Sequence, residues 1–181
     1  MRELIATGRR VALAAFLVAA GLWQPAAAAE EGKITAFAVW QGKGVTYPTE
    51  ENQGTMIGTI TGTMYVMTEQ GPVLSGEMVC PIVMTFNQAD SAQTGQARCS
   101  ISSKDGVVYS QLSCTGFQYV GCSGDYKITG GTGRFAGITG GGKAVVRSES
   151  RATGADKDAN GGVSEEARGI IYWQDLAYKI P

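Results

Sequence analysis

The sequence contains no histidine among its 181 residues. Histidine is the commonest general base at neutral pH and the usual partner of a serine or cysteine nucleophile, so its absence excludes those catalytic pairs. The chain also lacks a Cys-x-x-Cys motif and has only four cysteines, which argues against a structural zinc site. An enzyme of this composition would depend on carboxylate, tyrosine, lysine or arginine side chains.

Long apolar runs are also missing beyond the first thirty residues, where none approaches the roughly 20 residues of a transmembrane helix. The longest apolar segment is residues 11–23, which follow Arg2, Arg9 and Arg10 and precede an alanine tract that ends at Ala29. A positive segment, a short apolar core and small residues at a cleavage site are typical of a signal peptide. We therefore expect residues 1–29 to be removed and the protein to be exported, either to the periplasm or out of the cell.

Basic charge is scarce in the remaining chain. The expected leader holds three of the 15 basic and one of the 16 acidic residues, which leaves 12 against 15 and a net charge of −3. Scattered charges of this size provide no basic surface for nucleic acid or anionic lipid. We expect neither nucleic-acid binding nor stable membrane insertion, and the sequence leaves the oligomeric state open.

Strand-forming composition dominates residues 30–181. Threonine, isoleucine, valine, tyrosine and methionine recur between glycines, and no segment has a helical stripe of apolar residues. Short turns with glycine separate most of the segments. Eight consecutive strands predict an all-β fold, a single eight-stranded antiparallel up-and-down barrel of the calycin-like type, with a two-sheet sandwich as the alternative. The expected strands are residues 33–41, 55–68, 73–86, 96–103, 107–118, 122–129, 143–151 and 163–179.

The four cysteines all lie in the exported part, where an even number indicates two disulfides with three possible connectivities. Cys114 and Cys122 flank a segment that can turn near Gln118, so a hairpin would place them opposite each other. This leaves Cys80 to pair with Cys99 on neighbouring strands. We predict the disulfides Cys114–Cys122 and Cys80–Cys99.

Residues 128–140, with the sequence ITGGTGRFAGITG, are rich in glycine. They resemble the G-x-G-x-F-x-G-x-x-G signature of the allene oxide cyclase and dirigent-like β-barrels, and the clear similarity covers residues 124–146. The resemblance implies the barrel fold, with this segment in the connection that leads into a late strand. It gives an architectural role to four glycines: Gly131, Gly133, Gly137 and Gly140.

The same region contains the glycine and lysine spacing of a phosphate-binding loop at residues 137–144. Ala144 stands where a serine or threonine hydroxyl would hold magnesium, and the segment after the loop has strand composition where a helix is needed. We therefore expect the glycines to bend the barrel and not to bind phosphate.

Six side chains are candidates for lining the interior of such a barrel. Glu77 lies in a strongly apolar strand, where burial would raise the pKa of its carboxyl group. Arg168 has a similar position in the last strand, and would pair with Glu77 or orient an anionic ligand group if both faced inward. Exposure on the outer face is the alternative for both. The remaining candidates are aromatic residues that either line a cavity or pack in a core: Trp40, Tyr65, Tyr109 and Trp173.

The spacing of a calcium loop precedes the last expected strand. Asp156, Asp158 and Asn160 come before a glycine in the pattern D-x-D-x-N-G, which wraps oxygen ligands around a hard cation. The twelfth position is alanine where the pattern has a bidentate glutamate, so Glu165 or Glu166 would substitute. We predict a weak calcium site of Asp156, Asp158, Asn160 and Glu165, and no other cofactor. The alternative is a polar turn that binds no metal.

These features favour a non-catalytic exported barrel that binds a small, mostly apolar molecule or acts at the cell surface. One alternative is an isomerase or cyclase-type enzyme, as the resemblance implies, in which the barrel positions a reactive intermediate and excludes water. Another is a structural surface protein with a filled barrel. A dry apolar cavity would favour the binding protein, a cavity with a buried carboxylate or arginine would favour the enzyme, and a filled interior would favour the structural protein.

Overall fold

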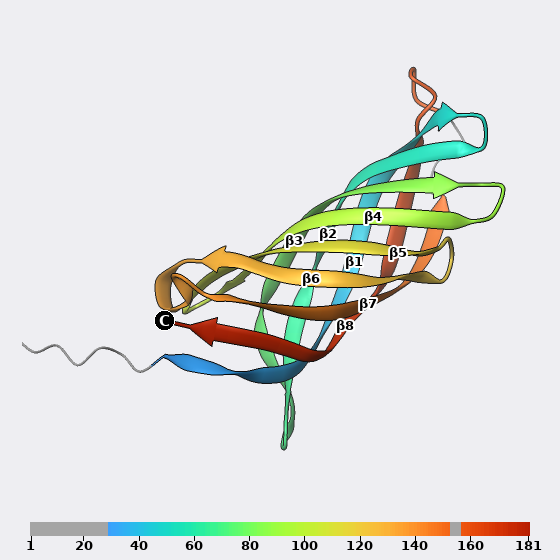
Figure 1. The fold of residues 1–181 in the computed structure, drawn as a ribbon. Helices are drawn as coiled ribbons and strands as arrows, with labels where there is room; N and C mark the ends of the chain where they lie inside the picture. The colour runs from blue at the N-terminus through green and yellow to red at the C-terminus, as the bar shows by residue number, and fades with distance from the viewer. Residues whose placement is uncertain (1–28, 153–156) are drawn as a thin grey trace, which may run out of the picture.

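The structure, a computed structural model, describes residues 29–152 and 157–181. Eight antiparallel strands follow one another around a closed barrel, and β1 pairs with β8 to complete it (Figure 1). This confirms the predicted all-β up-and-down barrel and excludes the two-sheet sandwich. The strands are β1 (Glu30–Glu50), β2 (Gln53–Thr68), β3 (Gly71–Asn87), β4 (Ala92–Ser103), β5 (Gly106–Phe117), β6 (Gly121–Gly131), β7 (Thr139–Ala152) and β8 (Val163–Ile180), with one 3-10 helix, η1 (Gly133–Phe135).

The connections divide the barrel into two ends. The turns after β1, β3 and β5 gather at one end, which we call the open end (Figure 1). The start of β1, the end of β8 and η1 lie at the other, which we call the closed end. In the described residues there is no helix with the length and hydropathy of a transmembrane span.

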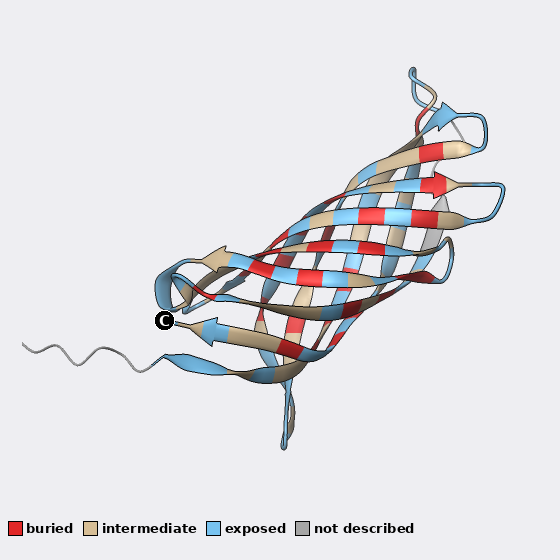
Figure 2. Cartoon of the chain, viewed as in Figure 1, coloured by how far each residue is buried: buried red, intermediate tan, exposed pale blue. Residues whose placement is uncertain are grey.

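Successive side chains alternate between the barrel interior and the outer surface, as the pleat of a strand requires (Figure 2). On β1, Ala38 and Trp40 are buried while Val39 between them is 52% exposed. On β8, Ile171 and Trp173 are buried while Tyr172 is 38% exposed. The outer surface therefore carries apolar side chains as well, so polarity alone does not distinguish the two faces.

The glycine-rich segment caps the closed end. Gly133 has a φ of +60° and Gly137 a φ of +78°, the left-handed region that glycine adopts without steric cost. Between them, Arg134 of η1 places Nη2 2.6 Å from Oε2 of Glu30, and the Tyr178 hydroxyl donates to the other oxygen of that carboxylate at 3.2 Å. These bonds join η1 to β1 and β8, and the hydrogen bond from Arg134 is the main cause that lowers the pKa of the Glu30 carboxyl group. A strand follows the segment, as expected.

Two disulfides join neighbouring strands: Cys80–Cys99 links β3 to β4, and Cys114–Cys122 links β5 to β6. The predicted connectivity is confirmed. The predicted position of Cys114 directly opposite Cys122 is wrong, because Cys114 faces Gly124 and Cys122 faces Gly116 in the β5–β6 ladder. The turn is centred one residue later than expected, so the second pair is diagonal, with Cα atoms 5.6 Å apart.

Candidate ligand-binding cavity

The inward side chains pack one half of the barrel tightly. Toward the closed end, the rings of Tyr126 and Trp173 meet edge to face, with centroids 5.1 Å apart and planes inclined by 62°. Met64, Met78 and Leu176 are buried in the same cluster. Burial raises the pKa of Tyr126 to about 12, because the phenolate would lose its hydration. This half is an ordinary apolar core.

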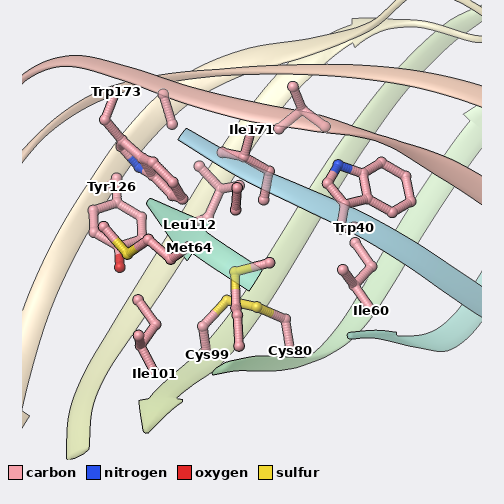
Figure 3. Close-up of a cluster of buried hydrophobic side chains, with 14 of the residues drawn as sticks. Trp40, Ile60, Met64, Cys80, Cys99, Ile101, Leu112, Tyr126, Ile171 and Trp173 are labelled. Atoms are coloured by element: carbon pink, nitrogen blue, oxygen red, sulfur yellow. A yellow bond between two sulfur atoms is a disulfide. The ribbon is translucent and has the colours of Figure 1, made fainter. Parts of the chain in front are cut away.

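The other half contains a cavity of about 140 Å³, which extends to the turns of the open end. Figure 3 shows the boundary: Tyr126 and Trp173 lie on one side, and Trp40 and Ile60 lie on the other with the Cys80–Cys99 disulfide between them. Tyr126 and Trp173 do not contribute to the cavity lining. Its inner wall is formed by apolar residues, namely Trp40, Ile60, Leu112, Ile171 and the Cys80–Cys99 disulfide.

Sulfur is prominent in the walls of this cavity. Met56 and Met84 line it together with both disulfides. Thioethers are polarizable and flexible, and they make favourable contacts with aromatic rings. The lining is therefore suited to an apolar or aromatic guest whose shape it can accommodate.

The cavity exists because several inward positions near the open end carry very small side chains. Gly42 and Gly44 of β1, Gly95 and Ala97 of β4, and Ala167 of β8 all line it. A Cβ atom added at Gly95 would lie 3.4 Å from Met84 Cγ and 3.5 Å from Cys114 Sγ, which is ordinary contact distance. A larger residue would therefore fit the backbone there, and glycine leaves the space empty.

Polar side chains interrupt the apolar lining, among them Gln93, Gln118, Ser148 and Glu165. Gln93 of β4 is only 6% exposed and lies opposite Phe86 and Gly116. Gln118, Ser148 and Glu165 are partly exposed and line the cavity nearer its mouth. The Gln118 backbone N–H donates to the Ser91 carbonyl at 2.9 Å, which joins two turns of the open end. Apolar walls with a few polar groups are typical of small-molecule sites.

Two of the predicted interior residues lie on the outer face instead. Glu77 is exposed and accepts a hydrogen bond from the Thr63 hydroxyl at 3.3 Å. Arg168 is exposed and donates from Nε and Nη2 to Glu149 Oε2 at 3.0 and 2.8 Å. The outward alternative therefore holds for both residues, and they form no pair with each other.

The four aromatic candidates separate into different environments. Trp40 lines the cavity, and Trp173 is buried in the packed half. Tyr109 is 44% exposed on the outer surface. Tyr65 stacks on Phe37 with ring centroids 5.2 Å apart, away from the cavity lining. Of the six candidates, only Trp40 belongs to the cavity.

The described residues cover only part of the predicted calcium site. Asp156 lies outside them. Asp158 uses Oδ1 to accept the backbone N–H groups of Gly162 at 2.7 Å and Asn160 at 2.8 Å, and these bonds lower the pKa of its carboxyl group. Glu165 lines the barrel cavity. Within the described part of the chain, no cluster of three or more histidine, cysteine, aspartate or glutamate residues is arranged to hold a metal ion. The calcium site stays a prediction.

Gln93, Gln118 and Ser148 were not among the candidates drawn from the sequence. Gln93 precedes the segment expected to form the fourth strand, which in the structure begins at Ala92. The available signal was the period of two in Gln93, Gly95, Ala97 and Cys99, which places small residues and a cysteine on the same face as the amide.

No family model matches the chain, and no curated protein matches it either.

Proposed function

We propose that this chain is an exported β-barrel protein that binds a small, mostly apolar molecule in the cavity of its open end, without changing it chemically. The observation that carries the proposal is the contrast between the two halves of the interior. One half is packed by Trp173 and Tyr126, while the other keeps a cavity of about 140 Å³ with apolar and sulfur-rich walls. A dry apolar cavity of about 150 Å³ in another protein binds benzene, so a guest of about one ring is expected.

Export is supported by the sequence and by the covalent structure. The first strand begins at Glu30, directly after the expected cleavage site. Both disulfides belong to the barrel wall, and such bonds persist in oxidising compartments. Intact-mass measurement of the protein from its host tests this part, with a chain that starts at Glu30 expected.

Binding is favoured over the alternative functions by the residues that line the cavity. A structural protein with a filled barrel would have no such space. An enzyme would need a buried acid or base near the guest, but Arg168 lies outside and Glu165 is partly exposed. Gln93, the most buried polar residue of the lining, does not titrate. The isomerase or cyclase alternative therefore has less support.

Native mass spectrometry of the protein isolated from its host tests the binding function. We expect a non-covalent adduct on the wild-type chain. Ala97→Leu should remove it, because Ala97 lines the cavity and a larger side chain would occupy the space. Thr94→Leu, on the exposed face of the same strand, is the matched control and should retain the adduct. No adduct from the host, together with no binding of added toluene, would contradict the proposal.

A further inference from the structure

Gln93 is the most buried polar residue in the cavity lining, with an exposure of 6%. Its carboxamide offers two N–H donors and a carbonyl acceptor. No side-chain hydrogen bond joins this carboxamide to another described residue, and its partners on the two neighbouring strands are Phe86 and Gly116. The buried side-chain polar atoms that lack a partner in the described residues do not include the Gln93 carboxamide. Its amide atoms therefore keep contact with the space of the cavity, where a polar group of a guest can hydrogen bond to them.

The cavity lining includes one carboxylate, Glu165, and one ammonium group, Lys43. Glu165 lies on β8 opposite Gly44 of β1, and both residues line the cavity. No described residue pairs with Glu165. The other charged residue of the lining, Lys43, has its Nζ 2.7 Å from Glu166 Oε1, and its side chain is 82% exposed. Lys43 therefore directs its charge to the outer surface and does not neutralise Glu165.

We infer that the ligand carries an uncharged head that both donates and accepts hydrogen bonds, such as a hydroxyl, and that Gln93 binds this head. The inference rests on the proposed binding function. A hydroxyl complements the Gln93 carboxamide, because its oxygen can accept from the amide N–H and its single hydrogen can be donated to the amide oxygen. A carboxylate or phosphate head would share the cavity with the Glu165 carboxylate, and the two like charges would repel each other. The site therefore selects a neutral amphiphile of about one ring and rejects the corresponding acid.

Three probes with the same ring test this inference by calorimetry: toluene, benzyl alcohol and benzoate. We expect the wild-type protein to bind benzyl alcohol about five- to tenfold more tightly than toluene, which corresponds to one net hydrogen bond. Benzoate should bind more weakly than benzyl alcohol. This ranking needs no variant, so it does not depend on whether a substitution disturbs folding.

Two variants assign the ranking to named side chains. Gln93→Leu should bind benzyl alcohol and toluene equally, while Gln41→Leu, at an exposed position of β1, should keep the preference. Glu165→Gln should improve benzoate binding, while Glu77→Gln, at an exposed position of the outer face, should leave it unchanged. If the wild type binds toluene but does not prefer benzyl alcohol, or binds benzoate as well as the alcohol, this inference is overturned and the binding function stands. If none of the three probes binds, this inference is overturned, and the binding function fails as well when the protein from its host carries no adduct.

Discussion

Trp40 and Trp173 point into the barrel from neighbouring strands, yet they belong to different halves of its interior. Trp40 lies on β1 opposite Gly169, and Trp173 lies on β8 opposite Ala36. Only Trp40 lines the cavity, while Trp173 is 1% exposed and packs against Tyr126. The two indoles therefore separate a region built for stability from a region available to a guest.

This separation predicts which tryptophan reports ligand binding. Benzyl alcohol should change the fluorescence of the wild-type protein because the guest contacts the Trp40 indole. The change should persist in Trp173→Phe and disappear in Trp40→Phe. Thermal unfolding should rank the two variants differently. Trp173→Phe should have the lower melting temperature, because the smaller ring leaves a gap in the packed half. A ligand-induced signal that follows Trp173 would place the guest at the wrong end of the barrel.

The glycine-rich segment predicts a stability effect that depends on backbone geometry. A Cβ at Gly133 would lie 2.4 Å from the Asp105 carbonyl oxygen, and its φ is +60°. Gly71 has a φ of +112° with no atom within 4 Å of such a Cβ. We expect Gly133→Ala to lower the free energy of unfolding by more than the cost of about 1–3 kcal/mol for an unfavourable φ alone, and Gly71→Ala to lower it by about that cost.

Urea unfolding of both variants checks this difference, with Lys143→Ala as a surface control. The Lys143 ammonium lies 2.6 Å from Asp125 Oδ1, but both side chains are 78% exposed, so the loss should be within about 1 kcal/mol. Equal destabilisation by Gly133→Ala and Gly71→Ala would show that the close approach to Asp105 is unimportant.

The strands, the barrel and the disulfide pairs were predictable because they depend on composition, turn residues and cysteine spacing. The faces of the strands were harder to assign. On β8, the outward Ile170 and Tyr172 are as apolar as the inward Ile171 and Trp173, so the alternation carried no polarity signal for Arg168. The cysteines do indicate which face of β3 is inward.

Cys80 is buried, and residues an odd number of positions from it on β3 lie on the opposite face. Glu77, three positions earlier, is therefore outward once Cys80 is placed inside. The cavity was not predictable in the same way, because its volume depends on which small residues from several strands meet at one level of the barrel. That level is set by the register between strands, which local sequence does not determine.

Tyr119 has a backbone conformation that costs stability. It has a φ of +63°, which is unfavourable for a bulky side chain, and it is 77% exposed in the β5–β6 turn. Asparagine tolerates this conformation, as Asn52 does at a φ of +61° in the β1–β2 turn. Tyr119→Asn should raise the free energy of unfolding by about 1 kcal/mol, while Asn52→Tyr should lower it by a similar amount. Chemical denaturation measures both changes. A loss of stability in Tyr119→Asn would show that the ring makes contacts that outweigh its backbone strain.

Calcium provides a separate test of the loop before β8. If Asp156, Asp158 and Asn160 bind this ion, millimolar calcium should raise the melting temperature, and magnesium should have a smaller effect because it requires a tighter octahedron. Asp158→Ala should abolish the calcium-dependent increase. Identical melting temperatures in EDTA and in excess calcium would contradict the calcium prediction and leave the loop as a polar turn.

Asp158 also predicts an acid-dependent loss of stability that requires no metal. Its carboxylate accepts hydrogen bonds from the backbone N–H groups of Gly162 and Asn160 and from the Tyr47 hydroxyl, and these bonds lower its pKa in the folded protein. A group with a folded pKa below its unfolded value stabilises the fold above the unfolded pKa, about 4 for aspartate. That contribution is lost as the pH falls through the folded pKa.

Asp158→Asn should therefore be less stable than wild type at pH 7. It should also lose less stability than wild type on acidification below pH 4, because asparagine does not titrate. Denaturation curves in EDTA from neutral pH to about pH 2 measure both slopes. Parallel pH profiles for the two proteins would show that the hydrogen bonds to this carboxylate do not stabilise the folded state.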